Sequence, residues 1–161
     1  MNYRPEIDGL RALAVFSVVV NHAHLSASNL TILSGGYLGV DIFFVISGYL
    51  ITKLIFSELI DSGTLDFGYF FERRIRRILP MLMATIIISL PLAWYTMLPD
   101  ALAEYSQSVI SAVLFCSNFF FYLITTEYSA DTSLLKPMLH TWSLGIEEQF
   151  YIFFPVTFYV V

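Results

Sequence analysis

The sequence predicts an all-α fold, a polytopic bundle of membrane-spanning helices. Of its 161 residues, 57% are hydrophobic and only 13% are charged, and the mean hydropathy is +0.72. An ordinary soluble domain carries roughly 25% charged residues. So large an apolar surplus indicates an integral membrane protein. Aromatic residues make up 17% of the chain, which suits lipid-facing surfaces and interfacial belts.

Five apolar windows predict about five transmembrane helices. The two clearest, residues 78–98 and 105–126, contain no charged residue. Roughly 20 apolar residues at ~1.5 Å each cross the hydrocarbon core. Three further windows, at about 10–25, 36–56 and 139–161, carry isolated polar residues. The first window could instead be a cleaved signal peptide, but the acidic residues that precede it argue against that reading.

The distribution of basic residues predicts a cytoplasmic N-terminus. Under that orientation all eight fall on the cytoplasmic side, namely Arg4, Arg11, Lys53, Arg73, Arg74, Arg76, Arg77 and Lys136. The opposite loops, at about 26–35 and 99–104, have none, as the positive-inside rule requires. The chain ends inside an apolar segment, so we expect it to be the first part of a larger membrane domain.

The composition also limits the partners. The single cysteine, Cys116, permits no internal disulfide and is expected to be a small apolar residue within a span. His22, His24 and His140 have no usable ligand spacing, so no metal is expected. The expected partner is the lipid bilayer, and nothing in the sequence predicts binding to nucleic acid.

Arg11 and His22 lie in the first window. Ionisable groups inside a bilayer cost a few kcal/mol each and are therefore candidates for function. Eleven residues at ~100° each make three turns plus about 20°, so the two side chains share a face about 16 Å apart, with Val15 and Val18 between them. The alternatives are membrane anchoring for Arg11 and an interfacial histidine for His22, as we expect for His24.

Asp41 lies in the second window, at a predicted depth close to that of His22. A carboxylate beside an imidazole fixes its tautomer and raises its basicity. The alternative is a carboxylate at a helix end that faces water. Ser47 and Gly48 follow on the same helix, where small residues allow a ligand or another helix to approach closely.

The last window carries a polar face. His140, Ser143 and Glu147 follow the i, i+3, i+7 spacing of one helical face, and Tyr151 extends it. This helix is expected to enter from the cytoplasm, which puts Glu147 about 12 Å deep. The alternative is that Glu147 pairs with a basic group and only holds helices together.

The stretch "FFERRIRRILP" presents two arginine pairs, Arg73 with Arg76 and Arg74 with Arg77. Guanidinium forks at i, i+3 can bind a phosphate from one face. The alternative is the topology signal together with contacts to anionic lipid headgroups. Residue chemistry alone fits both an enzyme that acts across the membrane and a proton-coupled transporter.

These motifs together resemble the bacterial acyltransferase family 3 membrane proteins, which O-acylate cell-surface glycans. Five signatures occur in order: Arg11 and His22 with ten residues between them, "GVDIFFVISGYLI", "FFERRIRRILP", "LLKPMLHTWSLGIEEQFY", and the Ser143, Glu147, Pro155 spacing that begins within the last. These stretches are most similar to the subgroup of the family in which the membrane domain is followed by an SGNH-type domain. The resemblance implies a domain of about ten helices, of which this chain would be the N-terminal half.

The resemblance also implies roles for the residues. His22 would be the general base, Asp41 would orient it, and Glu147 would pair with a basic group or relay a proton. Arg11 and Ser143 would belong to the donor site. An arginine pair would bind the donor too, with Arg73 and Arg76 preferred over Arg74 and Arg77. Supporting roles would fall to Ser47, Gly48, Arg74, Arg77 and Tyr151.

The implied function is that of an integral-membrane O-acyltransferase in the bacterial cytoplasmic (inner) membrane. The donor would be cytoplasmic acyl-CoA, most often acetyl-CoA, used as a co-substrate without any permanently bound cofactor. The acceptor would be a hydroxyl of a lipid-linked or surface glycan, such as lipopolysaccharide O-antigen, peptidoglycan or an exopolysaccharide. The alternatives are a proton-coupled transporter module and a non-catalytic membrane scaffold.

Overall fold

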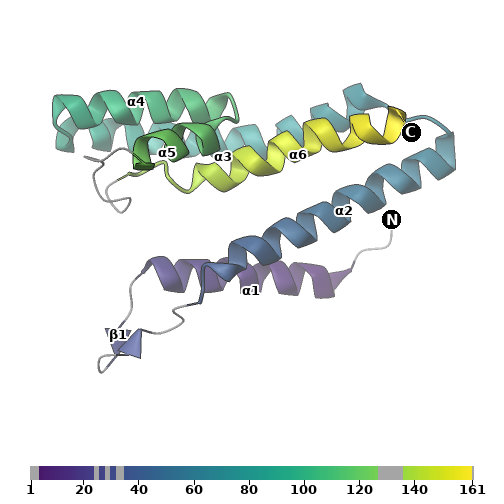
Figure 1. The fold of residues 1–161 in the computed structure, drawn as a ribbon, viewed down its shortest axis with the longest axis horizontal. Helices are drawn as coiled ribbons and strands as arrows, with labels where there is room; N and C mark the ends of the chain where they lie inside the picture. Colours follow the sequence, from purple (N-terminus) through teal and green to yellow (C-terminus); the bar gives the residue numbers. More distant parts are fainter. Residues whose placement is uncertain (1–3, 24–25, 28–29, 32–34, 127–135, 161) are drawn as a thin grey trace. The chain divides into compact units, whose positions relative to one another are not determined.

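The computed structural model describes residues 4–23, 26–27, 30–31, 35–126 and 136–160, and helices account for nearly all of them (Figure 1). The helices are α1 (Pro5–His22), α2 (Leu38–Ser62), α3 (Phe67–Thr96), α4 (Pro99–Val113), α5 (Ser117–Thr126) and α6 (Thr141–Val160). Two-residue strands β1 (Ser26–Ala27) and β2 (Leu30–Thr31) pair in antiparallel fashion. The predicted helical fold is therefore confirmed.

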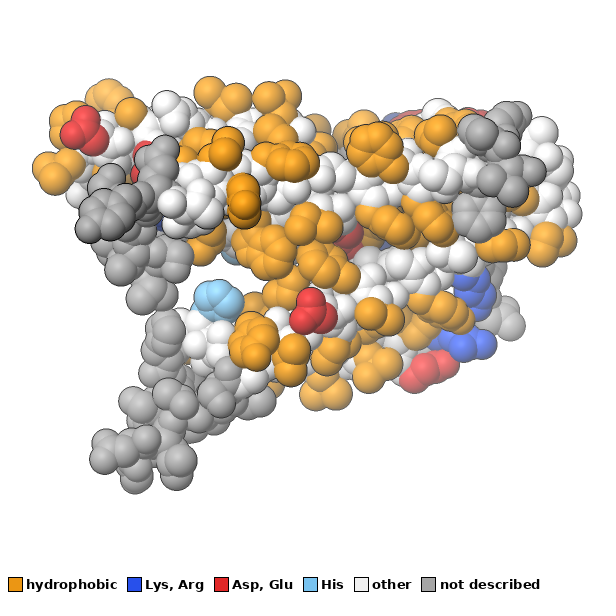
Figure 2. Space-filling model, viewed as in Figure 1, with side chains coloured by type: hydrophobic (Ala, Val, Ile, Leu, Met, Phe, Trp, Pro, Cys, Tyr) orange, Lys and Arg blue, Asp and Glu red, His pale blue; other side chains and the backbone are white. Residues whose placement is uncertain are grey.

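Within the described ranges, α2 and α3 are the helices long and apolar enough to cross a membrane. That the other windows also cross remains a prediction. Hydrophobic side chains are spread over the visible surface of the molecule (Figure 2). Four such residues on α3, Ile87, Ile88, Trp94 and Tyr95, are each at least 67% exposed, which suits a surface in contact with lipid.

The chain forms two compact units, residues 1–63 and 64–161, and small residues hold the first unit together. In this unit α1 and α2 pack against each other at Ala14, Ser17, Gly36 and Gly39. A Cβ added to Gly39 would lie 2.4 Å from the Ala14 carbonyl oxygen, and one on Gly36 would lie 2.3 Å from the Ser17 carbonyl oxygen. The two backbones therefore approach as closely as small-residue packing in membranes permits.

Replacing Gly39 by alanine is expected to destabilise the protein by about 1–3 kcal/mol, because the new methyl group meets rigid backbone. Thermal unfolding of the detergent-solubilised protein measures the effect. The matched control is Gly48→Ala on the same helix, where no heavy atom lies within 4 Å of the added Cβ. That change should be neutral, or stabilising by up to about 1 kcal/mol through helix propensity. Equal melting temperatures for the two variants would contradict the packing account.

In the second unit, α3 begins well before the apolar window at 78–98. The Asp66 carboxylate accepts a hydrogen bond from the Tyr69 backbone N–H at 3.0 Å, which caps the helix start. The four arginines, which lie between the predicted windows 36–56 and 78–98, are therefore helical: they fall within the first three turns of α3. A helical backbone fixes which arginine faces which neighbour.

The window at 105–126 is not one helix, so the single continuous helix predicted there is wrong. The chain turns back between Val113 and Ser117, and α5 returns alongside α4 (Figure 1). With 15 residues, α4 is only about 22 Å long, which is too short to cross the hydrocarbon core. At the turn Phe115 adopts a left-handed φ of 53°, an uncommon conformation for a residue other than glycine.

Side chains of α6 and α5 form the hydrogen bonds that hold this turn. The Gln149 amide donates to the Phe115 carbonyl oxygen at 2.8 Å and exchanges two hydrogen bonds, of 2.9 and 3.2 Å, with the Asn118 amide. Gly145 permits the approach, since an added Cβ would lie 3.1 Å from Asn118 Oδ1. An irregular backbone at membrane depth needs such partners. The absence of charged residues from this window could not reveal the turn, because the donor to the Phe115 carbonyl, Gln149, comes from a distant segment.

The hairpin changes the direction of the last helix. The Lys136 ammonium donates to the Glu104 carboxylate on α4, at the end of the unit where α3 finishes. At the other end, the Arg74 guanidinium of α3 lies over the Tyr151 ring of α6. Thus α6 runs antiparallel to α3 (Figure 1). Lys136 and the arginines therefore lie at opposite ends of this unit, which argues against the prediction that they share a side of the membrane. The predicted loop at 99–104 is wrong, because these residues begin α4.

The hairpin predicts which side of the membrane each loop reaches. With Cys116 replaced by serine, cysteines at positions 100 and 137 should react with an impermeant maleimide from the same side, and a cysteine at 72 from the opposite side. All three positions are exposed in the structure. Labelling of right-side-out and inverted vesicles measures this. If positions 72 and 137 were labelled from the same side, α4 and α5 would together cross the membrane once.

The core of this unit lies among α3, α4, α5 and the start of α6. Its buried members are Leu82, Ala93, Tyr105, Ala112, Phe121 and Met138. The Tyr105 and Ser89 hydroxyls form a hydrogen bond of 2.7 Å inside it, which links α3 to α4. This packing holds α3 and α6 in the relative register on which the polar residues below depend.

Candidate functional site

His22 is the last residue of α1, and its side chain is exposed. Its Nδ1 atom lies 2.9 Å from the Val18 carbonyl oxygen. A carbonyl oxygen only accepts, so Nδ1 must carry the hydrogen and donate it. In the neutral ring this tautomer leaves the Nε2 lone pair to accept a proton. The geometry therefore presents the imidazole in the form that a general base requires.

The structure does not bring Asp41 to His22. Gly39 packs against Ala14 and Ser17, so Asp41 lies beside the middle of α1 instead of its end. Asp41 is exposed, and in the described part of the chain no hydrogen bond or ion pair joins it to the imidazole. In the described residues the group that approaches Nδ1 is thus a carbonyl of the same helix, and the orienting role of Asp41 stays a prediction. Depth counted from helix ends missed the register that the glycines impose.

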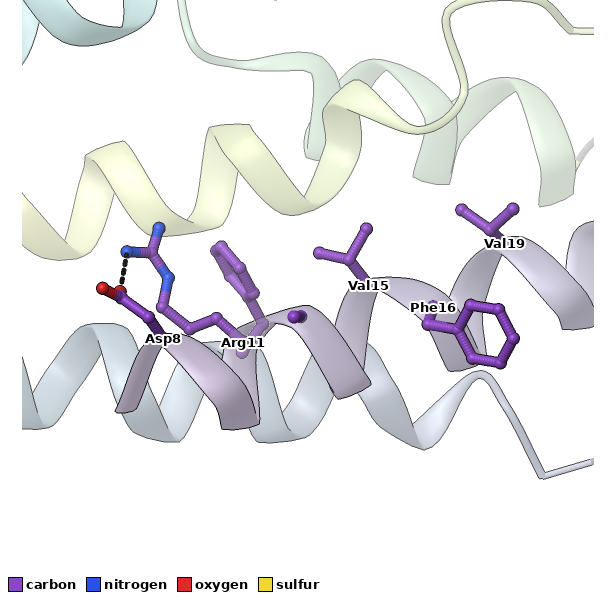
Figure 3. Close-up of a pocket in the computed structure, with 7 residues that line it drawn as sticks. Asp8, Arg11, Val15, Phe16 and Val19 are labelled. Atoms are coloured by element: carbon purple, nitrogen blue, oxygen red, sulfur yellow. Dashed lines mark ion pairs between the residues drawn. The ribbon is translucent and has the colours of Figure 1, made fainter. Parts of the chain in front are cut away.

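Arg11 lies at one end of an open groove along α1, as Figure 3 shows. Its Nη1 atom lies 3.9 Å from Asp8 Oδ1, and its guanidinium carbon lies 5.2 Å from the centroid of the Phe43 ring. Val15 and Val19 follow Arg11 along the same side of the helix (Figure 3). The intervening face is thus apolar as predicted, although Val18 turns towards Gly39 and Val19 lines the groove instead.

The small pair Ser47 and Gly48 is not where the helices meet most closely. Ser47 is buried, but the space beside Gly48 is open. The close contact of this unit lies at Gly36 and Gly39, two small residues on either side of the first residue of α2. His24 lies outside the described residues.

The four arginines of α3 differ in their surroundings: Arg74 is half-buried, whereas Arg73, Arg76 and Arg77 are exposed. The Arg74 guanidinium carbon lies 4.1 Å from the centroid of the Tyr151 ring and 5.9 Å from that of Phe70. Arg73 lies over the Tyr69 ring of its own helix at 4.9 Å. Arg76 forms a 2.7 Å ion pair with Glu72 in which both side chains are more than half exposed.

The buried face of α6 is rotated relative to the polar face that the sequence predicts, so that Glu148 is buried in place of Glu147. Its buried members are Thr141, Gly145, Glu148, Tyr151 and Pro155. Glu148, which the motif analysis did not select, is 8% exposed, and its Oε1 atom has no hydrogen-bond partner among the described residues. Arg74 and Arg77 are the cations that act on it electrostatically.

Glu147 lies beside this buried face and accepts a hydrogen bond from the Tyr151 hydroxyl. The structure therefore brings Glu147 and Tyr151 together with Arg74. It does not bring Ser143 to them, because the Ser143 hydroxyl donates to the His140 carbonyl oxygen of its own helix at 3.1 Å. The 3–4 spacing of Gly145, Glu148 and Tyr151 is the sequence signal that could have identified Glu148.

Comparisons with known proteins give a consistent result. A protein-family model described as an acyltransferase domain matches residues 4–161. A provisionally named O-acetyltransferase of Staphylococcus aureus (strain MSSA476) is 42% identical over 158 residues, which are 97% of this chain and 25% of that protein. The O-acetyltransferase OatA of S. aureus (strain NCTC 8325) is 38% identical over 156 residues, 96% of this chain and 24% of that protein.

The chain thus spans about a quarter of the length of these curated relatives. No solved structure matches it significantly.

Proposed function

Because this chain belongs to the acyltransferase domain family, whose model covers residues 4–161, we propose that its protein is an integral-membrane O-acyltransferase. The transferred group would be acetyl, as the names of the staphylococcal relatives indicate for those proteins. The proposed donor is acyl-CoA, and the proposed acceptor is a hydroxyl of a cell-surface or lipid-linked glycan. We place the protein in the bacterial cytoplasmic membrane with several crossings.

The observation that carries this proposal is the hydrogen bond between His22 Nδ1 and the Val18 carbonyl oxygen. Its Nδ1–H is committed to the Val18 carbonyl oxygen, so in the neutral ring the Nε2 lone pair can accept a proton. In the proposed reaction the acceptor hydroxyl oxygen attacks the thioester carbonyl carbon while Nε2 takes its proton. The carbon–sulfur bond then breaks, and the departing CoA thiolate takes that proton from the imidazolium. The products are the acyl ester and free CoA, with no net change in protons.

Arg73 and Arg76 are the proposed ligands of the donor's phosphates. Both are exposed, and the ion pair that occupies Arg76 is open to solvent and worth at most about 1 kcal/mol. Planar guanidinium groups bind phosphate oxygens through paired hydrogen bonds. Arg11 and Ser143 remain proposed members of the donor site.

The proposal is tested in membranes that carry the full-length protein and are supplied with isotopically labelled acetyl-CoA. The expected product is a labelled, alkali-labile ester on an envelope glycan, detected by mass spectrometry in the wild type and absent from a deletion strain. Comparing lipopolysaccharide, peptidoglycan and exopolysaccharide fractions identifies the acceptor. Solute or proton flux without any ester product would instead support the transporter alternative and reject the acyltransferase.

A further inference from the structure

Beyond the groups assigned to the reaction, the described part of the chain holds a cluster between α3 and α6. We call it the α3–α6 cluster: Phe70, Arg74, Glu147, Glu148 and Tyr151. Two aromatic rings that are at most 2% exposed, Phe70 and Tyr151, lie within 6 Å of the Arg74 guanidinium carbon. The Tyr151 hydroxyl is in turn held by the Glu147 carboxylate.

The contacts of the cluster hold Arg74 in one place. A cation over an aromatic face is stabilised by the ring's quadrupole, most strongly where water is excluded. The bond from Tyr151 to Glu147 fixes the ring that Arg74 covers. Glu148 lies one turn from Tyr151 on the same buried face of α6, and its Oε1 atom has no hydrogen-bond partner in the described part of the chain.

Holding Arg74 also sets the direction of its neighbours. On a helix, adjacent residues point about 100° apart, and residues three apart share a face. With Arg74 turned towards α6, Arg73 and Arg76 must project from the adjacent, exposed face of α3. A rotation of α3 by one residue would exchange the two pairs.

We propose that Arg74, Tyr151, Glu147 and Glu148 are positioning residues, which fix the rotation of α3 so that Arg73 and Arg76 present their guanidinium groups to the donor. This inference rests on the proposed function. It assigns Arg74 to holding the site, and the exposed Arg73 and Arg76 to contact with the acyl-CoA phosphates.

The test is a comparison of Arg74→Ala in two backgrounds, in membranes carrying the full-length protein and with acetyl-CoA as the varied substrate. In the wild-type background Arg74→Ala should raise the KM for acetyl-CoA about tenfold and change kcat less than about twofold. In the Arg73→Ala/Arg76→Ala background the same change should raise KM less than about twofold, because nothing remains to be positioned.

Conservative variants separate positioning from folding. Arg74→Lys keeps a cation over the ring and should recover part of the KM, whereas Tyr151→Leu removes the ring and should reproduce the effect of Arg74→Ala. Tyr151→Phe keeps the ring and should have a smaller effect than Tyr151→Leu. If Arg74→Ala does not accumulate in membranes, Arg74→Lys and Tyr151→Leu carry the same two-background comparison.

Two results would overturn the inference while the proposed function stands. An equal rise in KM in both backgrounds would mean that Arg74 contacts the donor itself. An unchanged KM for Arg74→Ala and Tyr151→Leu would mean that the cluster does not position the donor site. Wild-type membranes without acyl-CoA-dependent transfer would refute the proposed function instead.

Discussion

Replacement of His22 by alanine is expected to lower kcat for acyl transfer by about 10²–10⁴-fold, the usual contribution of a general base. The acceptor hydroxyl is a weak nucleophile until its proton is removed, and His22 Nε2 is the proposed proton acceptor. The KM for acetyl-CoA should change little, because the imidazole is not a proposed phosphate ligand. Initial rates of ester formation in membranes, corrected for the amount of protein, measure both constants.

Two further variants make this result specific. His22→Asn keeps an N–H near the position of Nδ1 that can donate to the Val18 carbonyl oxygen, but it has no group equivalent to Nε2. It should therefore be as inactive as His22→Ala. The matched control is His140→Ala: this exposed histidine also approaches a backbone carbonyl through Nδ1, that of Pro137 at 3.1 Å. Its loss should leave the rate near that of the wild type.

A wild-type rate for His22→Ala would remove the general base from the mechanism. Recovery of activity in His22→Asn would show that the histidine only ends the helix, since asparagine can serve there as well.

The double replacement Arg73→Ala/Arg76→Ala is expected to raise the KM for acetyl-CoA by about 10²–10⁴-fold. Each hydrogen bond to a charged group contributes about 1.5–3 kcal/mol, and tenfold in affinity corresponds to about 1.4 kcal/mol. Once substrate is saturating, kcat should stay near that of the wild type. Initial rates over a range of acetyl-CoA concentrations separate the two constants.

The donor itself supplies the control for this prediction. A short acetyl thioester without phosphate groups should be used equally by the wild type and the double variant, because its transfer needs no phosphate contact. Arg73→Lys/Arg76→Lys keeps the charges without the planar forks and should have an intermediate KM for acetyl-CoA. An equal loss with both donors would show that the arginines serve the structure of α3 or the chemical step.

The family and the helical fold class were predictable from the sequence. The family resemblance, drawn from motif spacing, is confirmed by the match over residues 4–161. The helical fold is confirmed as well, because long apolar runs with few charges leave the backbone little choice in lipid. The sequence could not decide which arginine pair binds the donor, Arg73 with Arg76 or Arg74 with Arg77, because both pairs have the same i, i+3 spacing.

Other assignments failed because they depended on contacts between distant segments. The sequence predicts that Asp41 lies beside His22, but the contacts of Gly36 and Gly39 with α1 set a helix register in which Asp41 lies beside the middle of α1. The buried acid of α6 is Glu148 instead of Glu147, because the packed face of α6 is set by its neighbours. Neither packing register can be read from one helix alone.

Composition and motif spacing were enough to predict a helical chain and its family. Apolar runs and charges act through residues close together in the chain, so the sequence reveals their effect. The hairpin at residues 105–126 and the pair of Lys136 with Glu104 became visible only in the folded chain. The same holds for the contact of Arg74 with the Tyr151 ring. The physical reason is that an apolar run fits a span and a hairpin equally well. The choice depends on partners, such as Gln149 for the Phe115 carbonyl, that lie more than thirty residues away.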